Sequence, residues 1–279
     1  MKARQITLIQ KLYIPNSHQL RQVINFFSYV EFQERDSSED WLSIFPNATT
    51  NMAICLGDKM EFPTGHGDNG VSIVCTSIAN LRVATKLRFV TIQFNSYGLY
   101  AFKGIPMHEM YNSHVDLEML FKPSECEVIR NELSESNSTD EVFEKMESFM
   151  TNKLKNSVID PRMPYSIALL SQNKYSMDDV SGKICLTPRG FRKLFSNQIG
   201  FSPAYYRKIT RFNRAAFQIN TFHGLSLTEI AYQNGYYDQS HFIKDFKHFS
   251  GISSRKYQNI KAKSTDFYNY KSTDPANLG

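Results

Sequence analysis

The chain has 279 residues, of which 32 are Lys or Arg and 27 are Asp or Glu, so its formal net charge is +5. With 41% hydrophobic and 21% charged residues, the composition is that of an ordinary globular protein and excludes the collagen-like, mucin-like and disordered classes. The length predicts two domains, because a domain usually holds about 100–200 residues. No apolar signal segment opens the chain and no apolar run is long enough to span a membrane, so we expect a cytoplasmic protein.

The charge is divided unevenly along the chain. Residues 1–159 carry 15 basic and 19 acidic residues, a net charge of −4, whereas residues 160–279 carry 17 and 8, a net charge of +9. A basic half of this kind indicates nucleic acid or an anionic membrane surface as partner, although a soluble basic domain with neither partner has the same composition.

The N-terminal half has short β-rich runs separated by turn residues. In the run 88–94, alternate residues share a face, and Gly57-Asp58 and Asp68-Asn69-Gly70 are turn signals. Further β-rich runs lie at 6–9, 52–56, 71–75 and 81–84. Apolar residues at helical spacing predict helices around residues 20–27 and 117–133. We therefore expect an α+β domain, a small antiparallel sheet or β-barrel with flanking helices.

Nothing in this half has the spacing of a catalytic or metal site. The polar candidates His18, His66, His108, His114 and Glu109 form no pair at metal-ligand spacing. The sequence holds no nucleophile elbow and no glycine-rich phosphate loop. The cysteines Cys55, Cys75, Cys126 and Cys185 form no CxxC pair and are expected to be reduced, mostly buried thiols. We expect no enzyme activity, no metal and no cofactor. An effector pocket inside a small barrel and a dimerisation domain with a filled interior both remain open.

A boundary between the halves is predicted near residue 160. Ser138 and Glu141 have capping-box spacing at the start of an amphipathic helix, and Pro161 and Pro164 follow its end. The predicted division is an N-terminal domain at 1–155, a linker at 156–164, a C-terminal domain at 165–262 and a tail at 263–279.

Two similar helix-turn-helix patterns lie in the basic half. In the first, Ser176 and Asp179 form a capping box, and Thr187-Pro188 begin a second helix that extends to about 198. Arg189, Arg192 and Lys193 lie off its apolar face, where a major-groove reader needs cations, although a solvated basic face has the same pattern.

The second pattern repeats the first about 50 residues later. Ser226 and Glu229 form a capping box, Gly235 provides the turn, and Asp238 caps the following helix. The first exposed turns of that helix carry side chains that can contact bases and phosphates, namely Gln239, Ser240, His241 and Lys244. A structural role for His241 is the alternative.

A longer helix from Ser202-Pro203 to about Thr221 connects the two patterns. Its apolar stripe leaves Arg207, Arg211 and Arg214 on another face. Such a rigid connection places two reading helices about one duplex turn apart, roughly 34 Å, so that they enter successive major grooves.

Residues 165–260 resemble the paired helix-turn-helix domain of AraC-type (AraC/XylS) transcription regulators. The likeness rests on Leu225 to Ala231, Gly235 to Phe242 and Phe246 to Gly251, with Arg192 to Phe195 and Gly200 to Pro203 upstream. Two departures are Ser253-Ser254 in place of the usual Thr-Pro and Ser181 in place of alanine. The N-terminal half is more loosely similar to the cupin-like domain of a subgroup of these regulators, with Asn95 to Gly98 in place of that domain's Pro-Gly-Gly-like loop.

The resemblance implies a sequence-specific regulator that binds double-stranded DNA, with control by an effector or a homodimer open and RNA polymerase as a partner if it activates. Base-reading residues are then Arg189, Arg192, Lys193, Gln239, Ser240, His241 and Lys244, and phosphate-binding residues are Thr187, Arg207, Arg211, Lys247, Arg255 and Lys256. A cupin-like small-molecule binder or enzyme with an accessory basic domain is the alternative. A nonspecific architectural DNA protein is less favoured, because binding through phosphate charge alone needs no amide or hydroxyl groups on a reading helix.

Overall fold

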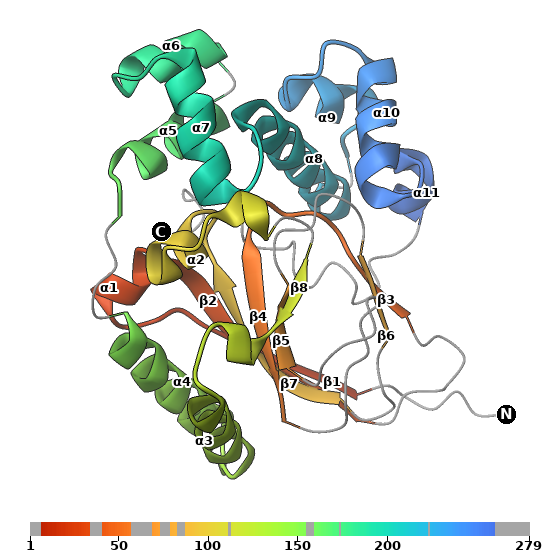
Figure 1. Cartoon of the computed structure of the whole chain (residues 1–279). Coiled ribbons are helices and arrows are strands. Elements are labelled where there is room, and N and C mark those ends of the chain that lie inside the picture. Colours follow the sequence, from red (N-terminus) through yellow and green to blue (C-terminus); the bar gives the residue numbers. More distant parts are fainter. Residues whose placement is uncertain are drawn as a thin grey trace, which may run out of the picture.

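The computed structural model describes residues 7–33, 41–56, 69–72, 79–82, 87–110, 113–154, 159–172, 174–222 and 224–259. The N-terminal part is built on an antiparallel sheet and the C-terminal part is helical (Figure 1). The expected fold class is therefore confirmed for both parts.

The larger sheet has six antiparallel strands in the order β1-β2-β7-β4-β5-β8. Their bounds are β1 Thr7–Tyr13, β2 Ile24–Gln33, β7 Leu87–Phe94, β4 Thr50–Cys55, β5 Asn69–Ser72 and β8 His114–Asp116. A smaller antiparallel pair joins β3 (Trp41–Ile44) to β6 (Ala79–Arg82). The β-rich runs in the described segments are strands, as predicted, while residues 6, 73–75 and 83–84 lie outside the described residues.

The helix expected over residues 20–27 is wrong. The chain forms only α1 (His18–Arg21) before β2 begins at Ile24. β2 lies between β1 and β7, and its side chains from Ile24 to Val30 are buried except that of Asn25. A strand covered on both faces has a continuous apolar run, which fits a helical period as well as a strand, and its aromatic and β-branched content favours the strand.

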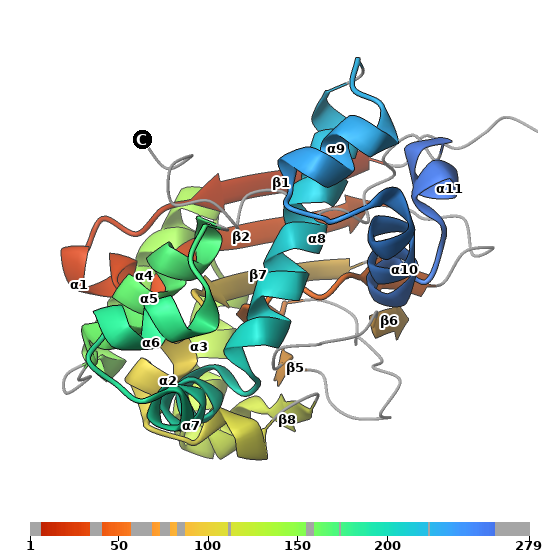
Figure 2. The same cartoon turned by 90° about the horizontal axis from the view of Figure 1, so that it is seen from above.

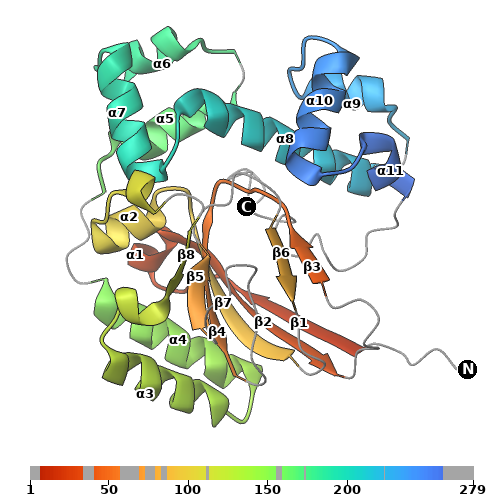
Figure 3. The same cartoon turned by 45° about the vertical axis from the view of Figure 1, so that its right-hand side comes forward.

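Helices cover one side of the larger sheet. α3 (Pro123–Ser134) and α4 (Thr139–Lys153) form a pair there, and the small β3–β6 sheet lies on the other side (Figure 3). Tyr13 of β1 attaches α4, because its ring stacks on Phe143 at 5.2 Å between centroids and its hydroxyl donates to Glu147 at 2.5 Å. Burial and this carboxylate raise the pKa of Tyr13 to about 12. The short helices α2 (Gly98–Lys103) and η1 (Met107–Glu109) lie between β7 and β8 along the chain, and η2 (Leu117–Met119) lies between β8 and α3.

The C-terminal part has seven helices among the described residues. They are α5 Arg162–Ser171, α6 Met177–Lys183, α7 Pro188–Ile199, α8 Pro203–Thr221, α9 Leu227–Gln233, α10 Gln239–Ser250 and α11 Ser254–Asn259. α5 begins within the segment expected as a linker, and residues 155–158 and the expected tail at 263–279 lie outside the described residues.

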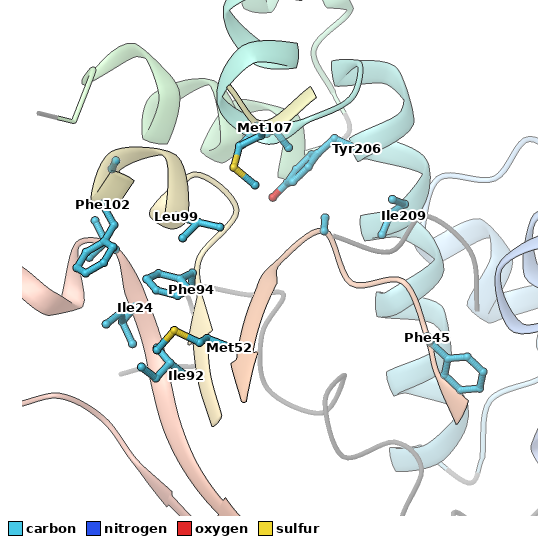
Figure 4. Close-up of a cluster of buried hydrophobic side chains, with 14 of the residues drawn as sticks. Ile24, Phe45, Met52, Ile92, Phe94, Leu99, Phe102, Met107, Tyr206 and Ile209 are labelled. Carbon is cyan, nitrogen blue, oxygen red and sulfur yellow. The ribbon is translucent and has the colours of Figure 1, made fainter. Parts of the chain in front are cut away.

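One hydrophobic core runs through both parts. Figure 4 shows sheet residues such as Met52 and Phe94 below Met107 of η1, with Tyr206 and Ile209 of α8 reaching toward them. Seen from above, α8 crosses over the sheet (Figure 2). The helical part is thus packed against the sheet domain by buried side chains.

Candidate nucleic-acid interface

The first helix-turn-helix unit consists of α6 and α7. The predicted capping box is present, with Ser176 Oγ accepting from Asp179 N at 3.0 Å and the Asp179 carboxylate accepting from Ser176 N at 2.9 Å. Cys185 makes the turn at a φ of 57°. Thr187 Oγ1 then accepts from Gly190 N at 3.1 Å and caps α7, which also has Pro188 in its first turn.

α7 buries one face and leaves its cations in solvent. Phe191 and Phe195 are buried and pack edge to face at 5.5 Å. The three cations assigned to this helix from the sequence, Arg189, Arg192 and Lys193, are all exposed. Their charged groups are therefore available to a polyanion.

The second unit consists of α9 and α10. Ser226 and Glu229 form the second predicted capping box, and hydrogen bonds from the Ser226 hydroxyl and backbone lower the pKa of Glu229. Gly235 makes the turn at a φ of 76°, where a residue with a side chain would be strained. Asp238 Oδ1 accepts from His241 N at 2.7 Å and caps α10.

α10 likewise has a buried face and an outward face. Its buried face is phenylalanine-rich, with Phe242, Phe246 and Phe249 fully buried. Gln239, Ser240, Lys244 and Lys247 are exposed as expected. The sequence reading missed two exposed apolar residues, Ile243 on the same outward face and Tyr237 just before the cap, which is 89% exposed. For Ile243 the available signal was its position on the outward face of the helix, whereas Tyr237 precedes the helix.

α8 holds the two units in a fixed arrangement. Phe195 of α7 packs on Tyr206 of α8 at 5.4 Å between ring centroids, and Phe246 of α10 packs on Phe212 at 5.1 Å. α7 and α10 stand on either side of α8, and both begin on the side turned away from the sheet (Figure 1). The exposed first turns of both helices therefore face the same way.

Arg211 of α8 ties that helix to the second unit. Its guanidinium donates to the Gly235 carbonyl at 3.1 Å, lies 4.8 Å from the Tyr236 ring centroid and is 3.7 Å from Asp245 Oδ2. Asp245 is 8% exposed, and His241 Nε2 lies 3.5 Å from the same carboxylate oxygen. Burial and the Asp245 charge raise the pKa of Tyr236. His241 is partly exposed, so its ring lies between the outward face of α10 and the buried Asp245 carboxylate.

Two further arginines of α8 have partners within the chain. Arg207 donates to the Tyr175 carbonyl at 2.7 Å, and burial lowers its pKa. Arg214 donates to the Ser171 carbonyl at 2.8 Å. Phosphate binding by Arg207 and Arg211 stays a prediction. Both side chains bind partners within the chain, which their spacing in the sequence did not indicate.

The two departures from the family pattern are accommodated locally. Ser253 Oγ accepts from Lys256 N at 3.2 Å and caps α11, whose Arg255 and Lys256 are exposed. Ser181 is buried, and its hydroxyl donates to the Asp178 carbonyl at 2.9 Å. A hydroxyl satisfied by the preceding turn costs little in a core position.

The C-terminal end of α7 packs against the sheet domain. Asn197 Nδ2 donates to the Tyr100 hydroxyl at 3.2 Å, and Ser96 Oγ donates to the Tyr206 hydroxyl at 3.4 Å. Gly200 ends α7 at a φ of 104°, and a Cβ there would lie 3.1 Å from the Met107 carbonyl oxygen. The first unit is thus attached to α2 and η1 at the end of α7 farthest from its exposed cations.

The polar candidates of the sheet domain do not come together. His18 and His108 are exposed, His114 is partly buried in β8, and His66 lies outside the described residues. No three of the described His, Cys, Asp and Glu residues are placed to hold a metal ion. Cys55 and Cys126 are free thiols and are buried, as predicted for most of the cysteines. Cys185 is exposed at its turn, and Cys75 is not among the described residues.

Two family models match separate parts of the chain. A helix-turn-helix domain model matches residues 180–260. Residues 180–260 form an AraC-type helix-turn-helix domain. Residues 13–116 match a model described as a domain of unknown function, DUF6597. The AraC-type domain makes this chain a DNA-binding transcription regulator. No described helix is both long and apolar enough for a membrane span.

Several solved structures are similar to parts of the chain, and no curated protein matches it. ToxT from Vibrio cholerae O395 is 17% identical over 85% of this chain and 98% of its own, with a TM-score of 0.48. An AraC-type regulator from Chromobacterium violaceum is 23% identical over 37% of this chain and 94% of its own, with a TM-score of 0.35. The C-terminal domain of AraT from Geobacillus stearothermophilus is 20% identical over 43% and 96%, with a TM-score of 0.36. At these values the likenesses say nothing about what this chain binds.

Proposed function

We propose that the protein is a sequence-specific regulator that inserts α7 and α10 into successive major grooves of double-stranded DNA. One observation carries the proposal. α7 and α10 are the second helices of the two helix-turn-helix units, and their exposed polar first turns face the same way on α8. α8, with 19 residues and a length of about 28 Å, lies between them, and successive major grooves on one face of a duplex are roughly 34 Å apart.

On α7 the base-reading groups are cationic. Arg189, Arg192 and Lys193 can donate to guanine O6 and N7 or to phosphate oxygens. Because all three are exposed and spread over the first two turns, α7 is suited to a site that contains guanine.

On α10 the base-reading groups are mostly uncharged. Gln239 can form a bidentate pair with adenine, Ser240 can bond either to a base or to a phosphate, and Lys244 can reach guanine or phosphate. His241 can donate to a base only with the ring nitrogen that Asp245 does not hold, so its contribution is narrower than the sequence indicated.

Phosphate contacts come from exposed groups around the reading helices. Lys247, Arg255 and Lys256 are exposed cations on α10 and α11. The Thr187 hydroxyl accepts from Gly190 N within the chain and can still donate to a phosphate. Such contacts fix the register of the protein on the duplex without reading its sequence.

The N-terminal domain is proposed to control this binding, through an effector or through dimerisation. The contacts from Tyr100 to Asn197 and from Ser96 to Tyr206 support this role, because a shift of α2 or its neighbouring loop would be passed directly to the first unit. As an activator, the protein would have RNA polymerase as a further partner.

Selection from random duplexes by the full chain tests the proposal. At about 150 mM salt, where charge contacts are partly screened, an enriched motif with two half-sites about one duplex turn apart is expected. Binding without any enriched motif would contradict the proposal and leave a nonspecific, charge-driven DNA protein.

A further inference from the structure

An isoleucine occupies the middle of the outward face of α10. Ile243 is 41% exposed, four residues after Gln239, three after Ser240 and four before Lys247. Residues three and four apart are neighbours on a helix surface, so Ile243 is surrounded by the polar groups that are proposed to meet DNA.

Packing within the protein does not account for this side chain. Phe242, Phe246 and Phe249 fill the inward face of α10 and are fully buried. Isoleucine is also a weaker helix former than the straight-chain residues that usually occupy exposed helix positions. An exposed isoleucine elsewhere would need no explanation, but here it lies in the centre of the proposed reading surface.

The major groove offers one apolar group for such a side chain. Among the base edges, only thymine has a methyl group there, at C5, and apolar side chains recognise it by contact. We propose that Ile243 contacts the C5 methyl of a thymine in the half-site read by α10, and that it thereby determines sequence preference at that position. This inference rests on the proposed function.

The geometry of the helix limits where that thymine can lie. Four residues advance an α-helix by about 6 Å, and base pairs are stacked about 3.4 Å apart. The thymine is therefore expected within about two base pairs of the base that Gln239 contacts. The motif position that changes in a Gln239→Ala variant marks that base.

Deoxyuridine substitution tests the contact, because it removes only the C5 methyl of thymine. Each thymine in the α10 half-site of the selected duplex is replaced singly, and the affinity of the wild-type full chain is measured. One position within two base pairs of the Gln239 base should lose about fourfold in affinity, the value for one buried methyl-sized group.

Variants then assign the loss to Ile243. Ile243→Ala should bind the thymine duplex about fourfold more weakly and should not distinguish thymine from deoxyuridine at that position. Ile243→Val, which keeps a branched side chain, should retain most of the discrimination. Val128→Ala is the matched control, since Val128 is a β-branched residue on helix α3 and is 55% exposed; it should leave both affinities unchanged.

The outcomes separate this inference from the function on which it depends. If no motif is enriched, the proposed function itself fails. If a motif is enriched but Ile243→Ala keeps the full deoxyuridine penalty, or the α10 half-site has no methyl-sensitive thymine, the Ile243 contact is overturned and the regulator stands. A DNA-neutral Ile243→Ala variant that loses transcriptional activity would overturn it in favour of a protein partner.

Discussion

Phe45 sets its ring edge to face against Phe212 of α8, with centroids 6.1 Å apart and an interplanar angle of 89°. The same ring lies 5.8 Å from Tyr257 of α11. Phe45 follows β3 and is 6% exposed, so a residue of the sheet domain is buried between α8 and α11 of the helical part. Together with the contact of Asn197 and Tyr100 in the first unit, this means that the sheet domain touches both halves of the DNA-binding domain.

Phe45→Ala tests how strongly this contact holds the two domains together. Truncating a buried phenylalanine usually costs about 3–5 kcal/mol, and we expect the free energy of unfolding of the full chain to fall by about 3 kcal/mol. Urea unfolding measures the change. Met119→Ala, which shortens a residue that is 68% exposed, serves as the control and should be nearly neutral. A loss below about 1 kcal/mol for Phe45→Ala would mean that the domains are not coupled through this ring.

Arg211→Ala separates a bracing arginine from a phosphate-binding one. The Arg211 and Asp245 side chains are only 14% and 12% exposed, so removing Arg211 leaves a nearly buried carboxylate with His241 as its remaining ion-pair partner among the described residues. Breaking such a pair costs about 3 kcal/mol of unfolding free energy. The salt dependence of DNA binding should stay close to that of the wild type.

The matched comparison is Lys247→Ala, an exposed cation on α10. It should leave stability unchanged and lower the slope of log affinity against log salt by about one. Adding Asp245→Asn to Arg211→Ala should recover part of the lost stability, because it removes the stranded charge. A stable Arg211→Ala variant with a lowered salt slope would restore the sequence-based assignment of Arg211 to a phosphate.

Local signals in the sequence were sufficient for the helix-turn-helix units. Each capping box is complete within four residues, Ser176 with Asp179 in one and Ser226 with Glu229 in the other. Their hydrogen bonds could therefore be predicted without knowing the rest of the fold. The phenylalanine spacing in α10 likewise fixed its inward face, and the exposed positions followed from it.

Long-range partners explain what the sequence did not indicate. β2 is a strand because β1 and β7 cover its two edges, and neither neighbour is visible in residues 24–33 themselves. Arg211 has the spacing of an exposed helix position, yet its partners Gly235 and Asp245 come from the second unit, which folds back onto α8. In both cases the deciding contact joins segments that are distant in the chain.

The Asp238 side chain should stabilise the fold, because it caps α10, but its negative charge should weaken DNA binding. Asp238→Ala removes the cap of α10, the hydrogen bond from His241 N to Oδ1, and should cost about 1 kcal/mol of unfolding free energy. Asp238→Asn keeps a capping oxygen and removes a negative charge beside the proposed phosphate contacts. We therefore expect Asp238→Asn to fold as stably as the wild type and to bind DNA more tightly, most clearly at low salt. Weaker binding by a stably folded Asp238→Asn would place this end of α10 away from the phosphates.

Acid should weaken the second unit through Glu229. The folded-state pKa of this carboxyl is lowered, first by the Ser226 hydroxyl and then by the Ser226 backbone N–H, relative to its ordinary value of 4.5. A lowered folded pKa adds stability above the unfolded pKa, and that stability is lost as the pH falls through the folded pKa. Glu229→Gln should therefore be less stable than the wild type at pH 7, and the gap should narrow as the pH falls below 4.5. Urea unfolding across this range measures it, and a gap independent of pH would show that the charge of Glu229 is not involved.

Arg192 and Gln239 provide the test of sequence reading, because both are exposed and lie on the outward faces of α7 and α10. Arg192→Ala should relax the preference for guanine in one half-site, and Gln239→Ala should relax the preference for adenine in the other, each by about 1–3 kcal/mol of discrimination. Repeating the duplex selection with each variant locates the changed positions. If α7 and α10 occupy successive major grooves, the two changed positions must lie about ten base pairs apart on the duplex. A shorter separation would place both changes in one groove, and a loss of affinity spread evenly over all sequences would mean that neither side chain reads a base.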